Sequence, residues 1–352
     1  MNLEHQDIMA WLREEDGQKL EALWQQADTT RRMYVGEEIH LRGLLEISNI
    51  CERSCWYCGI SKTNRKIGRY RMTEDEIMTC IHQAVAYGYG TMVMQAGEDY
   101  GIKRDWMADI IRRIKGETAL AVTLSLGERS DEDFMAWREA GADRYLLRFE
   151  TSNTRLYDRI HPPLGTRQSD RFAMLHTLKK LGYEVGSGVM IGIPGQTYED
   201  LAQDIVLFRE MDLDMIGVGP YISHPETMLG QTAEDFPGPV ADQVPNTELM
   251  TYKVIALTRI VCPEANIPST TALATLNLAE GRELGLTRGA NIVMPNLTPQ
   301  KYRIMYEIYP NKACITETPE NCVSCLNLRI HAIGRTVGKG RGSRKGHYAS
   351  QK

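Results

Sequence analysis

Most of the chain alternates short apolar runs with amphipathic stretches, and this alternation limits the fold more than any other feature. Runs rich in β-branched residues predict buried parallel strands, and apolar residues at helical spacing predict helices between them. The predicted strands are residues 41–47, 91–95, 119–124, 144–148, 185–191, 215–219, 266–270 and 291–294. Eight strand–helix units favour an α/β fold, a closed (β/α)8 TIM barrel. A six-unit open barrel is the alternative, because the last two strands are short.

Helix boundaries carry recognisable signals. Thr73 and Glu76 form a capping-box pattern at the start of one predicted helix. Gly88, Gly141 and Gly182 stand where helices are expected to end, because glycine accepts the left-handed conformation that follows a last turn. The predicted barrel helices are residues 73–87, 131–140, 171–181, 198–211 and 247–261.

The two ends of the chain differ from the barrel. Residues 6–34 have one apolar face beside many charges, so residues 1–38 are expected to form an N-terminal helical extension that acts as a lid or plug. The barrel is expected over residues 39–310, followed at 311–352 by a cysteine-containing extension. Residues 326–352 include seven Lys or Arg and no Asp or Glu. This tail is expected to be solvated and flexible, or to dock on an acidic partner protein.

Charge and hydropathy exclude several classes of partner. A formal net charge of -5 and a pI near 6.0 give no reason to expect nucleic acid or an anionic membrane as partner. No apolar window is long enough for a membrane span, and the first residues lack a signal-peptide pattern. We therefore expect a cytoplasmic protein. Six of the eight cysteines lie in two tight sets, which indicates metal binding rather than disulfides.

The first cysteine set directly follows the first predicted strand. Cys51, Cys55 and Cys58 have the spacing C-x3-C-x2-C, at the end of the barrel where such folds place their chemistry. Three thiolates can hold three irons of a 4Fe-4S cubane and leave the fourth iron open for another ligand. A zinc site would need a fourth ligand at nearby spacing, and His40 and Cys80 are too far along the chain. An electron-transfer cluster with a distant fourth ligand is the other alternative.

This spacing, with Tyr57 before the last cysteine, resembles the signature of the radical SAM superfamily. The resemblance implies that S-adenosylmethionine (SAM) binds the open iron and is reductively cleaved to methionine and a 5'-deoxyadenosyl radical. Candidate cofactor-binding residues follow successive strands: Tyr57, Gln95, Gly97, Glu98, Thr123, Ser125, Arg148, Glu150, Arg171 and Met190.

Four of these candidates have specific expected partners. Arg148 suits the SAM carboxylate through bidentate hydrogen bonds, with Arg171 assisting, and Glu150 suits the ribose hydroxyls or the sulfonium. Gly97 permits the backbone to approach the methionine amino group closely. A buried structural ion pair is the alternative interpretation of Arg148 and Glu150.

The run of motifs resembles one branch most closely: the HydE family of FeFe-hydrogenase maturases, in the group that includes biotin synthase and methylornithine synthase. The motifs are residues 69–73, 95–99, 122–128, 143–148, 217–222, 267–271 and 294–296. The resemblance implies action on an iron–cysteine complex with carbonyl and cyanide ligands, for the diiron subcluster of the hydrogenase H-cluster. It also implies HydG and HydF as partners and a flavodoxin or ferredoxin as electron donor.

Polar residues on the late strands could line the substrate cavity. The candidates are Thr270, Thr271, Met294, Tyr306 and Tyr309, with Tyr306 also a catalytic candidate. Packing is the alternative for Met294 and for the two tyrosines, which lie at i and i+3 on one helical face.

A second cysteine set follows the barrel. Cys314, Cys322 and Cys325 have the spacing C-x7-C-x2-C, which the HydE resemblance implies is an accessory 2Fe-2S or 4Fe-4S cluster. Methylornithine synthase lacks such a set, so it argues against a methylornithine synthase-like mutase. Zinc held with His331 or His347 is an alternative. A non-catalytic iron-sulfur scaffold, the alternative of another class, would leave Arg148, Glu150 and residues 95–99 without a purpose.

Overall fold

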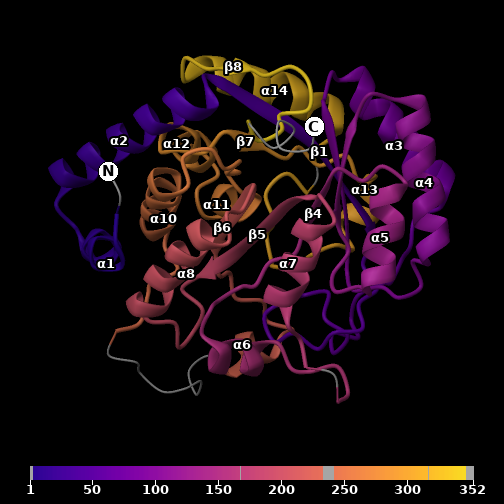
Figure 1. Ribbon diagram of the computed structural model, residues 1–352, viewed down its shortest axis with the longest axis horizontal. Helices are drawn as coiled ribbons and strands as arrows, with labels where there is room; N and C mark the ends of the chain where they lie inside the picture. Colours follow the sequence, from indigo (N-terminus) through magenta and orange to yellow (C-terminus); the bar gives the residue numbers. More distant parts are fainter. Residues whose placement is uncertain (1–2, 167, 233–241, 316, 346–352) are drawn as a thin grey trace.

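A curled parallel sheet forms the centre of the computed structural model, and helices surround it (Figure 1). Residues 3–166, 168–232, 242–315 and 317–345 are described, although the side chains of residues 319–322 are not. The strands follow the order β6-β5-β4-β3-β2-β1-β7. Their bounds are β1 Glu38–Ser48, β2 Thr91–Ala96, β3 Ala121–Ser125, β4 Arg144–Leu146, β5 Glu184–Ile191, β6 Met215–Pro220 and β7 Ile292–Val293. The expected barrel-type α/β fold is confirmed.

The expected strand over residues 266–270 is not a regular strand. This segment lies between β6 and β7 and joins them through isolated parallel bridges, Met215 with Asn266 and Pro268 with Ile292. Pro268 has no N–H to give to a ladder, and Ile267 N–H donates to the Asn291 side chain over 2.9 Å instead. Single bridges through residues 266–268 therefore connect β6 to β7 and close the curled sheet.

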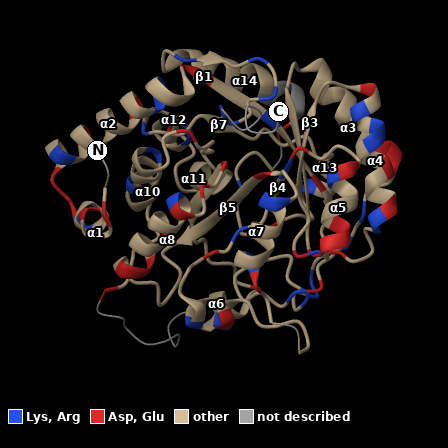
Figure 2. Cartoon of the chain, viewed as in Figure 1, with Lys and Arg blue, Asp and Glu red and all other residues tan. Residues whose placement is uncertain are grey.

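Helices cover the outside of the sheet. Thr73 and Glu76 form both bonds of the capping box at the start of α3, and Gly88, Gly141 and Gly182 all have positive φ after helix ends. No helix in the described ranges is long and apolar enough to cross a membrane. Acidic and basic residues of both signs are spread over the outer helices (Figure 2). The helix bounds are α3 Glu74–Ala86, α4 Arg104–Glu117, α5 Asp131–Glu139, α6 Thr154–Ile160, α7 Arg171–Lys180, α8 Tyr198–Glu210, α9 Met228–Thr232, α10 Glu248–Val261, α11 Thr271–Leu276, α12 Gly281–Thr287, α13 Gln300–Arg303 and α14 Pro319–Ala332.

The N-terminal segment forms two helices rather than one. The first, α1 His5–Arg13, ends at its C-cap Glu14. Asp16 caps the second, α2 Gly17–Val35, by accepting from two backbone N–H groups. These helices pack on α8 and α10, on the outside of the barrel. Lys253 in α10 donates to the carbonyl of Leu12 over 3.0 Å. The interpretation as a lid or plug is therefore wrong, because the apolar face covers other helices.

The C-terminal tail packs against the end of the barrel where the strands begin. Its short strand β8 (Thr336–Val337) pairs with β1. Arg42 and Arg144 then donate to the carbonyls of Gly342 and Arg341 over 2.8 and 3.0 Å. Arg344 forms ion pairs with carboxylates at this end of the barrel. The expectation of a solvated, flexible tail is wrong for residues 335–344, because Arg335, Arg341 and Arg344 form ion pairs within the molecule.

Candidate active site

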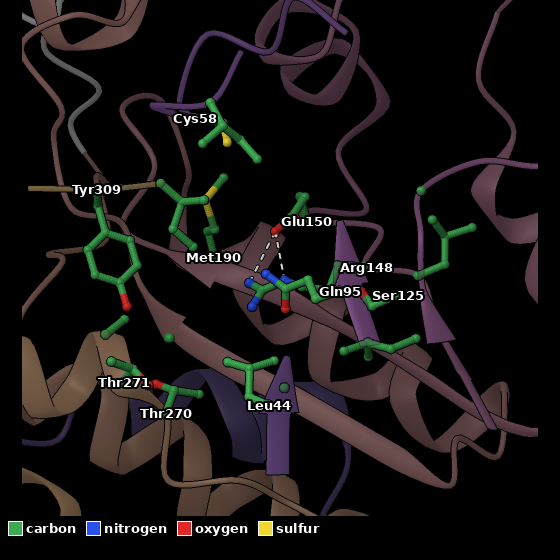
Figure 3. Close-up of a pocket in the computed structure, with 18 of the residues that line it drawn as sticks. Leu44, Cys58, Gln95, Ser125, Arg148, Glu150, Met190, Thr270, Thr271 and Tyr309 are labelled. Carbon is green, nitrogen blue, oxygen red and sulfur yellow. Dashed lines mark hydrogen bonds and ion pairs between the residues drawn. The ribbon is translucent and has the colours of Figure 1, made fainter. Parts of the chain in front are cut away.

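One cavity of about 370 Å³ lies inside the barrel at the end where the strands finish. Its wall includes every residue that the sequence assigned to the first cysteine set, to the cofactor and to the substrate. In Figure 3, Cys58 lies on one side of the cavity, Arg148 and Glu150 face its centre, and Thr270 and Tyr309 lie together on another side. Parallel strands bring these side chains together because their carboxyl ends meet at the same edge.

The three thiols of the first set lie on a loop that leaves β1. Cys55 is buried, Cys51 and Cys58 are partly buried, and none forms a disulfide. Burial and the neighbouring Cys51 raise the pKa of Cys58 to about 12, and burial likewise raises the pKa of Cys55. Thiols in such a place become thiolates beside a positive metal centre, so the donor set suits an iron cluster.

A tight turn after β2 supports the cysteine loop. At Gly97 an added Cβ would lie 2.3 Å from the carbonyl oxygen of Ile50 and 2.9 Å from Cys51 Cβ. The N–H of Glu98 donates to Cys51 Sγ over 3.4 Å, a bond typical of cluster thiolates. Among the described residues, no three His, Cys, Asp or Glu side chains converge on a single ion. Three thiols on one loop, one of which accepts a backbone N–H, are a donor set that suits three irons of a cubane.

A buried charge network stands behind the cysteine loop. Glu128 accepts from Arg53 over 2.7 Å and from Arg171 over 3.0 Å. His161 lies between the two guanidinium groups, and burial together with these charges lowers its pKa to about 2, so its ring is neutral. Arg171 also donates to the carbonyl of Arg148. Arg171 thus lines the cavity with each of its three side-chain nitrogens in a hydrogen bond to the protein.

Arg148 and Glu150 form an ion pair at the centre of the cavity wall, with Arg148 Nε 3.1 Å from Glu150 Oε2. Glu150 has a φ of 63°, a conformation that costs free energy in a residue with a side chain. Backbone hydrogen bonds with Gly188 and Met190, each 3.1 Å long, hold it there. The strain directs the carboxylate into the cavity. Nearby, the buried hydroxyl of Thr123 has no partner among the described residues, which fits a ligand contact.

The late-strand residues form another side of the cavity. Tyr306 is buried, and its hydroxyl accepts from Gln95 over 3.1 Å. Thr270 caps α11 by accepting from Leu273 N–H over 3.3 Å. Burial and the nearby Glu46 carboxylate raise the pKa of Tyr306, so its hydroxyl stays protonated.

Two cavity residues that form an ion pair, Glu46 and Lys312, were missed in the sequence. A signal existed for Glu46, because a charged residue inside an apolar strand is rarely buried without a partner. No local pattern marks Lys312. Arg53, Glu128 and His161 were missed for the same reason.

The second cysteine set lies apart from the cavity. Cys314 is partly buried in a loop with a φ of 62°, and Cys325 is exposed on α14. The Cys322 side chain and His347 lie outside the described residues. His331 is near the end of α14.

Known proteins resemble the chain in sequence and in structure. Residues 45–208 match the family model of the radical SAM superfamily. The chain is 45% identical to the FeFe-hydrogenase maturase subunit HydE of Thermotoga maritima, over 92% of this chain and 89% of that protein. It is 26% identical to 3-methylornithine synthase of Methanosarcina acetivorans, over 83% of this chain and 79% of that protein.

Solved structures agree in fold. The crystal structure of methylornithine synthase has a TM-score of 0.79 at 23% identity, covering 96% of this chain and 95% of that one. HydG from Carboxydothermus hydrogenoformans has a TM-score of 0.69 at 17% identity, covering 84% of this chain and 68% of that one. The sequence identity to the maturase, together with the cysteine loop and its cavity, shows that the chain belongs to the HydE family of the radical SAM superfamily.

Proposed function

We propose that this radical SAM enzyme acts in assembly of the hydrogenase H-cluster, on an iron–cysteine complex with carbonyl and cyanide ligands that binds in the barrel cavity. One observation carries the proposal: a single cavity brings the three cluster thiols, the Arg148–Glu150 pair and the late-strand polar residues together. The 45% identity to a HydE maturase over 92% of the chain supports the substrate class.

The position of each residue in the cavity indicates whether it would bind the cluster or SAM. Cys51, Cys55 and Cys58 would hold three irons of the 4Fe-4S cluster. When bound, this cluster supplies the electron that cleaves SAM to methionine and a 5'-deoxyadenosyl radical. Arg148 donates to the SAM carboxylate with the guanidinium hydrogens that Glu150 does not use, and Glu150 accepts from the ribose hydroxyls.

The remaining cavity residues would bind either SAM or the substrate, on different sides of the cavity. The cofactor packs against the part of the wall formed by Tyr57, Gly97, Ser125 and Met190. Thr123 offers it a hydroxyl that has no partner among the described residues. The substrate occupies the side formed by Thr270, Thr271, Met294, Tyr306 and Tyr309. The Tyr306 hydroxyl is a hydrogen-bond donor at that side, because its raised pKa keeps it protonated.

The proposal includes partners and a second metal site. HydG, which supplies the iron complex, and HydF are the partner maturases, and a flavodoxin or ferredoxin provides electrons, all in the cytoplasm, where thiols stay reduced. Cys314, Cys322 and Cys325 hold an accessory iron-sulfur cluster. Replacing Cys325 by alanine should lower the iron content but leave SAM cleavage in place, because Cys325 does not line the cavity.

The test is formation of 5'-deoxyadenosine by anaerobically reconstituted protein with dithionite and SAM. A synthetic iron–cysteine carbonyl/cyanide complex should stimulate it, and Cys58→Ala should abolish it. Cys262→Ala is the matched control, because Cys262 lies outside the cavity and should retain activity. Absence of 5'-deoxyadenosine from protein with an intact cluster would contradict the proposal. Stimulation by lysine, with formation of an isomer, would favour a methylornithine synthase-like mutase instead.

A further inference from the structure

A buried ion pair stands on the substrate side of the cavity. Glu46 on β1 has a fully buried side chain, and the side chain of Lys312 is 5% exposed. Lys312 Nζ donates to Glu46 Oε1, and Asn296 Nδ2 donates to Glu46 Oε2 over 3.0 Å. Each carboxylate oxygen therefore has a partner, and the carboxylate is fixed in place.

The ammonium group of Lys312 has more N–H donors than its hydrogen bond to Glu46 uses. An ammonium has three N–H groups, and within the described residues Lys312 Nζ makes its hydrogen bond to Glu46. Its other close neighbour is the ring of Tyr306, whose centroid lies 5.4 Å away. Buried donors without partners are costly, and Lys312 lines the cavity. A ligand in the cavity is therefore the available partner for the remaining donors.

The arrangement parallels the pair at the cofactor side. There Glu150 holds Arg148 and leaves guanidinium hydrogens directed into the cavity. Here Glu46 holds Lys312 in the same manner, next to Tyr306. One cation–carboxylate pair thus follows β4 on the cofactor side of the cavity, and another, which includes Glu46 of β1, stands on the substrate side.

We propose that Lys312 is a specificity-determining residue for the substrate. Its ammonium group, held by Glu46, donates to the anionic end of the substrate bound beside Tyr306. The inference rests on the proposed function, because it takes the substrate to be an anionic iron–cysteine complex in this cavity.

The experiment separates recognition from structural support. Lys312→Met alone would leave Glu46 buried without its cation and would destabilise the protein. The double variant Glu46→Gln/Lys312→Met removes both charges, so it should melt near the wild type. The KM for the synthetic iron–cysteine complex, measured as stimulated 5'-deoxyadenosine formation, should rise by roughly 10- to 100-fold in the double variant, with kcat changed much less.

Three further variants serve as controls. Asn296→Ala should lower the melting temperature but keep the KM, because it retains the ammonium group. Lys312→Gln keeps a neutral donor and should give an intermediate KM. Lys301→Met removes a surface lysine paired with Glu76 and should change neither the melting temperature nor the KM.

The outcomes distinguish a failure of the proposed function from a failure of the role given to Lys312. A wild-type enzyme that the complex does not stimulate overturns the proposed function and this inference with it. A stimulated wild type with the same KM in the double variant and in Lys312→Gln overturns the inference alone, because the pair is then only structural.

Discussion

Replacing Gly97 by alanine tests whether the cysteine loop depends on a close backbone approach. The added Cβ would lie 2.3 Å from the carbonyl oxygen of Ile50, whereas such carbon–oxygen contacts are normally about 3.3 Å or longer. The obstacle is backbone next to Cys51, so no side-chain rotation relieves it, and the loop must move by about 1 Å. Overpacking of this kind typically costs about 1–3 kcal/mol.

Two measurements check this prediction. Urea unfolding of the apo-protein should show a free energy of unfolding lower by about 1–3 kcal/mol in Gly97→Ala. Iron per chain after reconstitution should also fall, because the displaced loop carries Cys51. Gly116→Ala in α4 is the matched control: its Cβ meets nothing within 4 Å, so the variant should gain up to about 1 kcal/mol. If Gly97→Ala equals the wild type in both measurements, the reasoning is wrong.

Three other predictions follow from single side chains. Arg148→Met should raise the KM for SAM by roughly 10- to 100-fold, whereas the surface variant Arg112→Met should not; equal KM values would remove Arg148 from the SAM site. Burial raises the pKa of Asp204 from 3.8 to about 7, so the free energy of unfolding should fall as pH rises from about 4 to 7, by at most about 4 kcal/mol. Asp204→Asn should remove that fall, and parallel pH curves in urea unfolding would contradict the burial argument. Arg344→Ala should lower the free energy of unfolding by about 1 kcal/mol and speed trypsin cleavage of the tail, since Arg344 pairs with Asp212 and Asp214; an unchanged cleavage rate would mean that these pairs do not hold the tail.

The core of the fold could be predicted because its signals are local. The runs at 41–47 and 185–191 are mainly apolar, and they lie within β1 and β5. The segment 266–270 is less apolar, with Ile267 and Thr270 as its β-branched residues, and its pairing depends on Pro268 and on the Asn291 side chain. A strand-like sequence pattern does not predict which backbone N–H groups will form hydrogen bonds with a neighbouring strand.

The location of the site could be predicted for a geometric reason. Residues that follow parallel strands meet at one end of a barrel, so Gln95, Arg148 and Thr270 were expected around one cavity. The Glu46–Lys312 pair could not be predicted, because its members are 266 residues apart and only the fold brings them together. The same holds for the tail, whose Arg341 and Arg344 pair with Asp143 and Asp214, far away in the sequence.

The central claim is that Cys51, Cys55 and Cys58 hold a cluster with one iron open to SAM. The most direct test is the electron paramagnetic resonance spectrum of the reduced protein with and without SAM, recorded in a Cys325→Ala variant to remove signals from a second cluster. Addition of SAM should shift the spectrum, and the shift should be absent in Arg148→Met at the same SAM concentration. A reduced cluster whose spectrum SAM leaves unchanged would contradict the account.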